Sequence, residues 1–142
     1  MADVYNLHRF LTAQAPVYDS VLAELRAGKK SSHWIWFVFP QIAGLGHSAM
    51  AQQFAIGSLD EAKAYLQHPV LGQRLRECTQ LVLDVNGRSA EEIFGYPDNL
   101  KFRSCMTLFL TVAPDNAIFK DALTKYFDGK PDQVTLDILA QQ

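Results

Sequence analysis

The chain has 142 residues, of which 49% are hydrophobic and 20% are charged, and its formal net charge at pH 7 is −2. This composition is typical of a single globular domain, here residues 1–142, and it excludes an intrinsically disordered chain. The slightly negative charge argues against binding to nucleic acid, because nucleic-acid-binding surfaces need an excess of lysine and arginine.

The sequence has no feature of a membrane or secreted protein. The first residues, Met1–Asn6, lack a basic region followed by an apolar stretch, and the longest apolar run is far shorter than a membrane span. The two cysteines, Cys78 and Cys105, lie far apart inside apolar patterns, which predicts buried thiols rather than a disulfide or a metal pair. We therefore expect a cytoplasmic protein.

Apolar residues at helical spacing predict two helices at the beginning of the chain. The first begins after Asp3, a residue type that caps helices, and the second begins near Pro16 and ends at Gly28. A polar loop, residues 29–32, then leads into the aromatic run.

The aromatic run, residues 34–39, is the least regular part of the pattern. It is too continuous for an amphipathic helix, and it is followed by Pro40, which disfavours a helical residue before it. We interpret the run as a buried extended or irregular segment that ends at Pro40. If the run is extended, Trp34 and Trp36 share one face, because alternate residues of extended backbone point the same way.

The remainder of the chain predicts a series of short helices. Ser48 is placed to cap one of them, and the pairs Ser58/Glu61 and Ser89/Glu92 have the spacing of capping boxes.

The segment 100–112 is apolar nearly all round, which predicts a central buried helix. Asp98 is expected to cap it, and either Asp132 or Thr135 is expected to cap a last helix. In total the sequence predicts an all-α fold: a compact single-domain bundle of about eight short helices with one buried extended aromatic segment.

The first candidate site is the turn Gly44-Leu45-Gly46-His47-Ser48. Glycines allow backbone amides to converge, and the start of a helix adds free N–H groups and partial positive charge. Gly44, Gly46, His47 and Ser48 are therefore candidate ligands of a phosphate or carboxylate. The alternative is a tight turn that only connects the buried segment to a helix.

The second candidate site is the aromatic run itself. Trp34 or Trp36 could stack on a flat ring, Gln41 lies at the end of the run, and His33 could transfer a proton. The alternative is that both tryptophans belong to the core.

The third candidate site is the beginning of the segment 100–112, with Lys101, Arg103 and Ser104. Cations at a helix start oppose the helix dipole, so a negative group is expected nearby. That group is either an anionic ligand, held by the fork of Arg103, or a protein carboxylate in an ion pair. Asp98 is the second candidate catalytic residue beside His33. Neither a metal-ligand spacing nor a cofactor fingerprint is present, so we expect no metal and no cofactor.

The stretch 33–48 resembles the signature of the bacterial and fungal family known as domain of unknown function 1810. Four further segments agree with that family: 59–62, 68–72, 93–95 and 98–107. The resemblance covers nearly the whole chain and implies a small, mainly helical cytoplasmic domain with no established reaction. Ile35 stands where the family pattern would have methionine, a substitution that conserves volume.

In its size, helical order and aromatic-rich early segment, the chain also resembles the NADAR superfamily of helical N-glycosidases. That resemblance implies action on ADP-ribose conjugates, and it carries over no individual residue.

Two functional hypotheses follow. The favoured one is a small-molecule-binding domain for an anionic ligand, such as a nucleotide or an ADP-ribose derivative, with hydrolysis as the expected reaction if the domain is an enzyme. The other is a non-enzymatic protein-interaction domain with an ion-paired core. It predicts no concave site near residues 44–48, and it predicts that Lys101 and Arg103 each contact a protein carboxylate.

Overall fold

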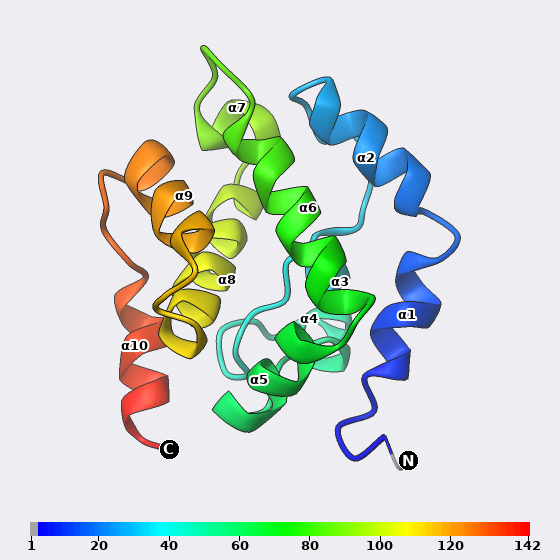
Figure 1. Ribbon diagram of the computed structural model, residues 1–142, viewed down its shortest axis with the longest axis vertical. Coiled ribbons are helices and arrows are strands. Elements are labelled where there is room, and N and C mark those ends of the chain that lie inside the picture. Colours follow the sequence, from blue (N-terminus) through cyan, green and yellow to red (C-terminus); the bar gives the residue numbers. More distant parts are fainter. Residues whose placement is uncertain (1–2) are drawn as a thin grey trace.

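The computed structural model describes residues 3–142, and its regular elements within that range are helices (Figure 1). The all-α prediction is therefore confirmed, with ten helices in the described residues instead of about eight. In chain order they are α1 (His8–Gln14), α2 (Tyr18–Arg26), α3 (Ile35–Val38), α4 (Ala49–Gln53), α5 (Leu59–Gln67), α6 (Leu71–Leu83), α7 (Ala90–Phe94), α8 (Asp98–Val112), α9 (Ala117–Phe127) and α10 (Gln133–Ala140).

Helices α6 and α8 form the centre of the bundle. Helix α6 packs against α2, α3, α5 and α9, and α8 packs against α3, α5, α7, α9 and α10. In Figure 1, α1 and α2 lie along one side of the molecule and α9 and α10 along the other. Because α8 has neighbours on most sides, it needs apolar residues nearly all round, as its sequence predicted.

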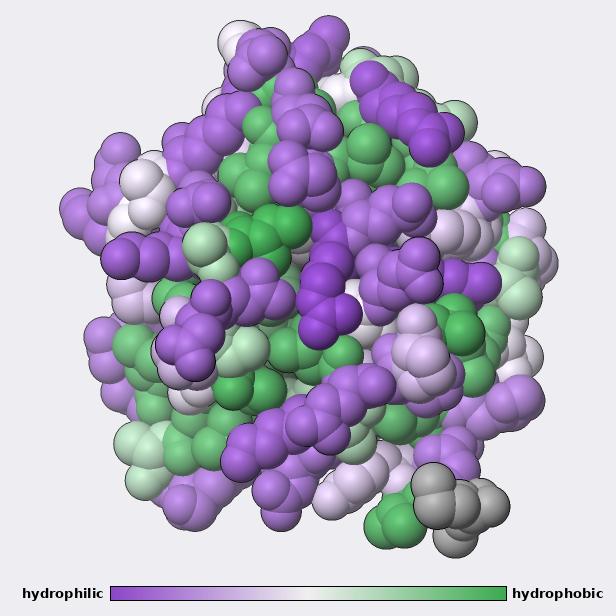
Figure 2. All heavy atoms as spheres, viewed as in Figure 1, coloured by the Kyte–Doolittle hydropathy of each residue, from purple (hydrophilic) through white to green (hydrophobic). Residues whose placement is uncertain are grey.

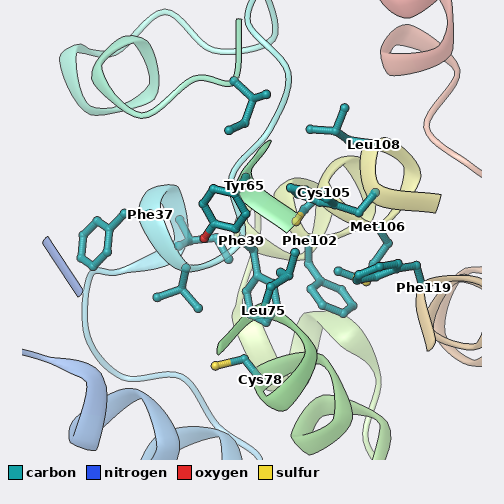
Figure 3. Packing of buried hydrophobic residues seen from close by; sticks show 14 of the residues in the cluster. Phe37, Phe39, Tyr65, Leu75, Cys78, Phe102, Cys105, Met106, Leu108 and Phe119 are labelled. Carbon is teal, nitrogen blue, oxygen red and sulfur yellow. The ribbon is translucent and has the colours of Figure 1, made fainter. Parts of the chain in front are cut away.

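The core is rich in aromatic rings that contact one another edge-on, tilted or stacked. The ring of Phe102, on α8, lies 4.9 Å from that of Phe39 and 4.7 Å from that of Phe94 between centroids. Such pairs contribute about 0.5–1.5 kcal/mol each beyond the area they bury. Figure 3 shows Cys78 and Cys105 well separated within this packing. Both thiols are free and buried, as expected.

The aromatic run is not extended as predicted, because its middle forms the single helical turn α3. The turn packs against α1, α6 and α8, so its residues are buried on several sides and show no amphipathic period. Buried Gln14 donates a hydrogen bond from Nε2 to the Phe37 carbonyl oxygen at 2.6 Å, which satisfies a carbonyl at the end of the turn. The two tryptophans consequently do not share a face: Trp34 is 1% exposed, whereas Trp36 is half-buried.

The chain becomes extended only after α3, where Ile42 forms a parallel bridge with Ile56. The Ile56 amide donates to the Gln41 carbonyl and the Ala43 amide donates to the Ile56 carbonyl, both at 2.8 Å. This bridge fixes the backbone just before the glycine turn.

Three of the predicted helix starts are present as expected. The Ser48 hydroxyl accepts from the Ala51 amide, Ser89 and Glu92 form a complete capping box, and the Asp132 carboxylate accepts from the Thr135 amide to cap α10. Ser58 also caps its helix, but the Glu61 carboxylate accepts from the Gly57 amide and from Arg9 instead of closing the box. Asp98 does not cap α8: Pro97 occupies that position, and Asp98 is the first residue of the helix.

The surface is mixed, with polar side chains between small apolar patches on the face shown in Figure 2. No helix of residues 3–142 has the length and apolar character that a bilayer span requires. In the same part of the chain, no cluster of three or more His, Cys, Asp or Glu side chains could hold a metal ion.

Candidate functional site

Two adjoining hollows lie where the glycine turn meets α3 and the beginnings of α8 and α10. The first, here called the Trp36 hollow, has a volume of about 200 Å³. The second, the Lys101 hollow, has a volume of about 240 Å³. Gln41 and Gly46 line both, so the two hollows are neighbours, and together they are here called the cleft.

The Trp36 hollow has an aromatic and mainly uncharged wall. It is lined by Trp36, Gln41, Ile42, Ala43, Gly44, Gly46, Ala51, Gln52, Phe54 and Ala55. Among the described residues, no charged side chain lines it. Its volume is below the roughly 300–1,000 Å³ of drug-sized sites, so it suits one flat ring system rather than a whole dinucleotide.

The Lys101 hollow combines charged groups with an apolar rim. Lys101, Ser104 and Asp132 supply its polar side chains together with Gln41. Its apolar lining comes from Leu45, Pro97, Leu100 and Val134. Leu100 and Val134 are 42% and 54% exposed, so this rim faces solvent.

Asp98 lies between two lysines at the beginning of α8. Its Oδ2 is 2.8 Å from Lys30 Nζ and its Oδ1 is 3.1 Å from Lys101 Nζ. One carboxylate thus faces two ammonium groups, and this group of three carries one surplus positive charge. Since the Lys30 side chain is only 7% exposed, the surplus is most accessible at Lys101, which is 23% exposed.

The lysines also connect this group to the tryptophans. Lys101 Nζ lies 5.9 Å from the ring centroid of Trp36, and Lys30 Nζ lies 5.2 Å from that of Trp34. These distances fall within the range of cation–π attraction. A cation on the wall of one hollow therefore lies beside the aromatic ring on the wall of the other.

Asp132 is a site residue that the sequence indicated only as a possible helix cap. Its Oδ2 accepts hydrogen bonds from Ser104 Oγ at 3.0 Å, from Thr135 Oγ1 at 2.5 Å and from the Thr135 amide at 3.2 Å. Its own amide donates to Thr107 Oγ1 at 2.9 Å. Oδ1 has no hydrogen-bond partner within residues 3–142. The carboxylate is thus held through one oxygen only.

The glycine turn shapes the cleft more than it offers amides to a ligand. A Cβ on Gly46 would lie 2.6 Å from the Ala51 side chain, so only glycine fits there without a shift, and Gly44 has φ +107°. The Ser48 hydroxyl accepts from the Ala51 amide as a helix cap. The carbonyl of exposed His47 accepts from Gln52 Nε2. Neither His47 nor Ser48 lines the two hollows.

Three other candidates lie outside the cleft. Arg103 donates from Nε to the Lys130 carbonyl at 2.9 Å and from Nη2 to the Pro131 carbonyl at 3.1 Å. Trp34 is in the core, where its Nε1 donates to Glu24 at 3.0 Å, and His33 is exposed.

The candidates thus divide into two groups. The cleft brings together Trp36, Gln41, Gly44, Gly46, Lys101 and Ser104. The concavity beside Gly44 and Gly46 favours the ligand-binding hypothesis, whereas the pairing of Lys101 with Asp98 is what the interaction hypothesis expects. Arg103 contacts carbonyl groups, which neither hypothesis anticipated.

A family model described as "Protein of unknown function (DUF1810)" matches residues 4–139. Among solved structures, the chain is similar to the conserved hypothetical protein Rv1873 from Mycobacterium tuberculosis, with 56% sequence identity and a TM-score of 0.96. That match covers 97% of this chain and 99% of the other. No curated protein matches the chain.

Proposed function

The chain belongs to the DUF1810 family, and because that family's description names no activity, we propose a function from the cleft itself. The protein is a small-molecule-binding domain whose ligand consists of a flat ring and an acidic group. The ring lies in the Trp36 hollow and the acidic group contacts Lys101. Nucleotides and ADP-ribose derivatives are members of this ligand class.

The observation that supports this proposal is the short separation of an aromatic ring and a cation across two adjoining hollows. Lys101 Nζ is 5.9 Å from the Trp36 ring centroid, and each residue lines its own hollow. Convergence of a few polar groups on a mainly apolar concavity is typical of ligand sites.

The surplus charge beside Asp98 supports the acidic part of the ligand. Lys101 Nζ has three donors and one partner in the described chain, Asp98 Oδ1. An incoming carboxylate or phosphate oxygen can accept from the remaining donors. Such a charge-assisted hydrogen bond is stronger than one between neutral groups.

Hydrolysis, which the resemblance to NADAR N-glycosidases implies, is a further prediction about the same cleft. The two expected catalytic residues give it little support, because His33 is exposed outside the cleft and both Asp98 oxygens contact lysines. To test this prediction, the protein is incubated with ADP-ribose conjugates, and the release of ADP-ribose or nicotinamide-type products is measured by chromatography.

Binding is tested by titrating ring-bearing acids and following tryptophan fluorescence and the thermal midpoint. The panel contains AMP, ADP-ribose, 3-phenylpropionate and aromatic amino acids, with adenosine and benzyl alcohol as uncharged counterparts. A ligand that binds the native state raises the midpoint. We expect at least one acid to bind, and the Trp36→Leu and Lys101→Gln variants to weaken its binding about tenfold each.

Lys120→Gln is the matched control, because Lys120 is exposed on α9 and lines neither hollow. It should leave binding unchanged. The proposal fails if no acid of the panel binds, or if binding is insensitive to both Trp36→Leu and Lys101→Gln.

A further inference from the structure

The Lys101 hollow is lined by one cation and one anion, Lys101 and Asp132, and each has hydrogen-bonding capacity left over. Lys101 Nζ has Asp98 as its one partner in residues 3–142. Asp132 uses Oδ2 for three hydrogen bonds and leaves Oδ1 without a partner in that same range. Both residues line the same space of about 240 Å³.

The Asp132 carboxylate is fixed in place by its surroundings. Thr135, a buried residue of α10, donates to Oδ2 twice. The hydroxyl of Ser104, a buried residue of α8, lies 3.0 Å from Oδ2 and 3.1 Å from the Leu100 carbonyl, so its one proton is shared between them. These contacts hold the carboxylate between two helices that pack together. A carboxylate held in this way presents its second oxygen without the loss of side-chain freedom that an unrestrained carboxylate would suffer on binding.

A ligand end that satisfies both groups needs an acceptor for Lys101 and a donor for Asp132 within one small space. A phosphate supplies the acceptor, but its two negative charges would also face Asp132, and like charges at short range repel. A carboxylate beside an ammonium group supplies both parts and matches the charge of each wall.

We propose that the Lys101 hollow recognises a zwitterionic α-amino-acid head, with its carboxylate on Lys101 and its ammonium group on Asp132 Oδ1. This inference rests on the proposed binding function and narrows its ligand to a ring-bearing amino acid or a close derivative. Asp132 then determines specificity, because it favours acids that also carry an ammonium group. Leu100 and Val134 form the apolar rim beside the head.

The experiment compares three ligands that differ by one charged group each. L-Phenylalanine carries both groups, 3-phenylpropionate lacks the ammonium group, and phenethylamine lacks the carboxylate. Calorimetric titration should give L-phenylalanine an affinity at least about tenfold above that of either analogue, since one lost charge-assisted hydrogen bond costs about that factor. L-Tyrosine and L-tryptophan test whether the ring size changes the ranking.

Two variants test which side chain binds which charged group of the ligand. Asp132→Asn keeps an oxygen for Ser104 and Thr135 while it removes the charge, so it should lower the affinity for L-phenylalanine about tenfold and leave 3-phenylpropionate unchanged. Lys101→Gln should lower the affinity for both acids and leave phenethylamine unchanged. Asp121→Asn, at an exposed position on α9, is the control for the loss of one negative charge.

A structural role of Asp132 alone predicts a different result. In that case Asp132→Asn and Ser104→Ala would change the unfolding free energy and would weaken all three ligands equally. The inference is overturned by that result, or by equal affinities of wild type for L-phenylalanine and 3-phenylpropionate. Equal affinities with retained dependence on Lys101 would leave the proposed function intact, whereas absence of binding by every ring-bearing acid would remove both.

Discussion

Arg9 and Lys101 both lie half-buried beside an acidic side chain, but they use their hydrogen-bonding capacity very differently. Arg9 donates through all five of its N–H groups. Its acceptors are the carbonyl oxygens of Tyr5, Asn6, Gln53 and Ala55 and the carboxylate of Glu61. Lys101 uses one of its three donors and lines a hollow.

The difference separates a cation that holds the fold together from one that is available to a ligand. Arg9 connects the N-terminal loop, the end of α4 and the beginning of α5, and it has no donor left over. Lys101 shares its one carboxylate with Lys30 and keeps two donors. The number of unused donors beside a cavity, rather than the presence of charge, therefore marks a candidate site.

The largest effect is expected for Arg9→Ala. The substitution leaves four carbonyl groups and the nearly buried Glu61 carboxylate without their partner, and breaking such a pair costs about 3–4 kcal/mol. Urea unfolding at pH 7 measures this loss. A change below about 1 kcal/mol would mean that water replaces the guanidinium, and the contrast with Lys101 would disappear.

Asp98→Asn should have the next largest effect, about 2 kcal/mol. Lys30, whose side chain is 7% exposed, would lose its charged partner and remain poorly solvated. Urea unfolding compared with that of Asp115→Asn, an exposed position, provides the measurement. An effect no larger than that of the control would show that the Asp98 group contributes nothing to the fold.

The Glu24 carboxylate accepts four hydrogen bonds, so its contribution to stability should depend on pH. Burial favours its neutral form, but hydrogen bonds from the Ser32 hydroxyl, the Ser31 amide, Trp34 and the Ser32 amide outweigh burial and lower the pKa of its carboxyl to about 2. The ordinary value is 4.5, so the folded-state pKa is depressed. The carboxylate's contribution is therefore fully present above about pH 4.5 and is lost as the pH falls toward 2.

We expect Glu24→Gln to cost about 1–2 kcal/mol at pH 7 and to flatten the decline of stability between pH 4.5 and 2. Denaturant unfolding across that pH range, with the exposed Glu91→Gln as control, measures both effects. An unchanged slope would mean that Glu24 does not couple folding to protonation.

The smallest effect on stability is expected for Lys101→Gln. Lys30 remains on Asp98, and a partly exposed ion pair contributes no more than about 1 kcal/mol. The same variant should weaken ligand binding about tenfold, so stability and binding change independently. A loss of stability as large as that of Asp98→Asn would assign Lys101 to the fold and would weaken the proposed site.

Much of the fold could be predicted because local rules govern its helix ends. Ser48 and Ser89 cap the helices that follow them, as their spacing indicated. The apolar circumference of α8 likewise predicted its central position. The aromatic run was misread because tertiary contacts surround α3 on several sides, so periodicity carried no signal there.

The candidate site was only partly predictable because its charges pair over long sequence separations. Lys30 contacts Asp98 from the loop before α3, and nothing local in either segment indicates that contact. Arg103 donates hydrogen bonds to the carbonyls of Lys130 and Pro131, in the loop between α9 and α10, rather than to a carboxylate. Asp132 looked like an ordinary helix cap, and its unused oxygen can be recognised only from the three-dimensional arrangement.

The bridge between Ile42 and Ile56 should lower the entropic cost of binding a ligand in the cleft. It holds Gln41, Ile42 and Ala43, which line the Trp36 hollow, against Ile56 before any ligand binds. Occupation then requires little ordering of the backbone, and the entropy of association is less unfavourable than for a loop that must first freeze. The amide protons of Ala43 and Ile56 should accordingly exchange slowly with deuterium in the ligand-free protein, and addition of a ligand should slow this exchange little further.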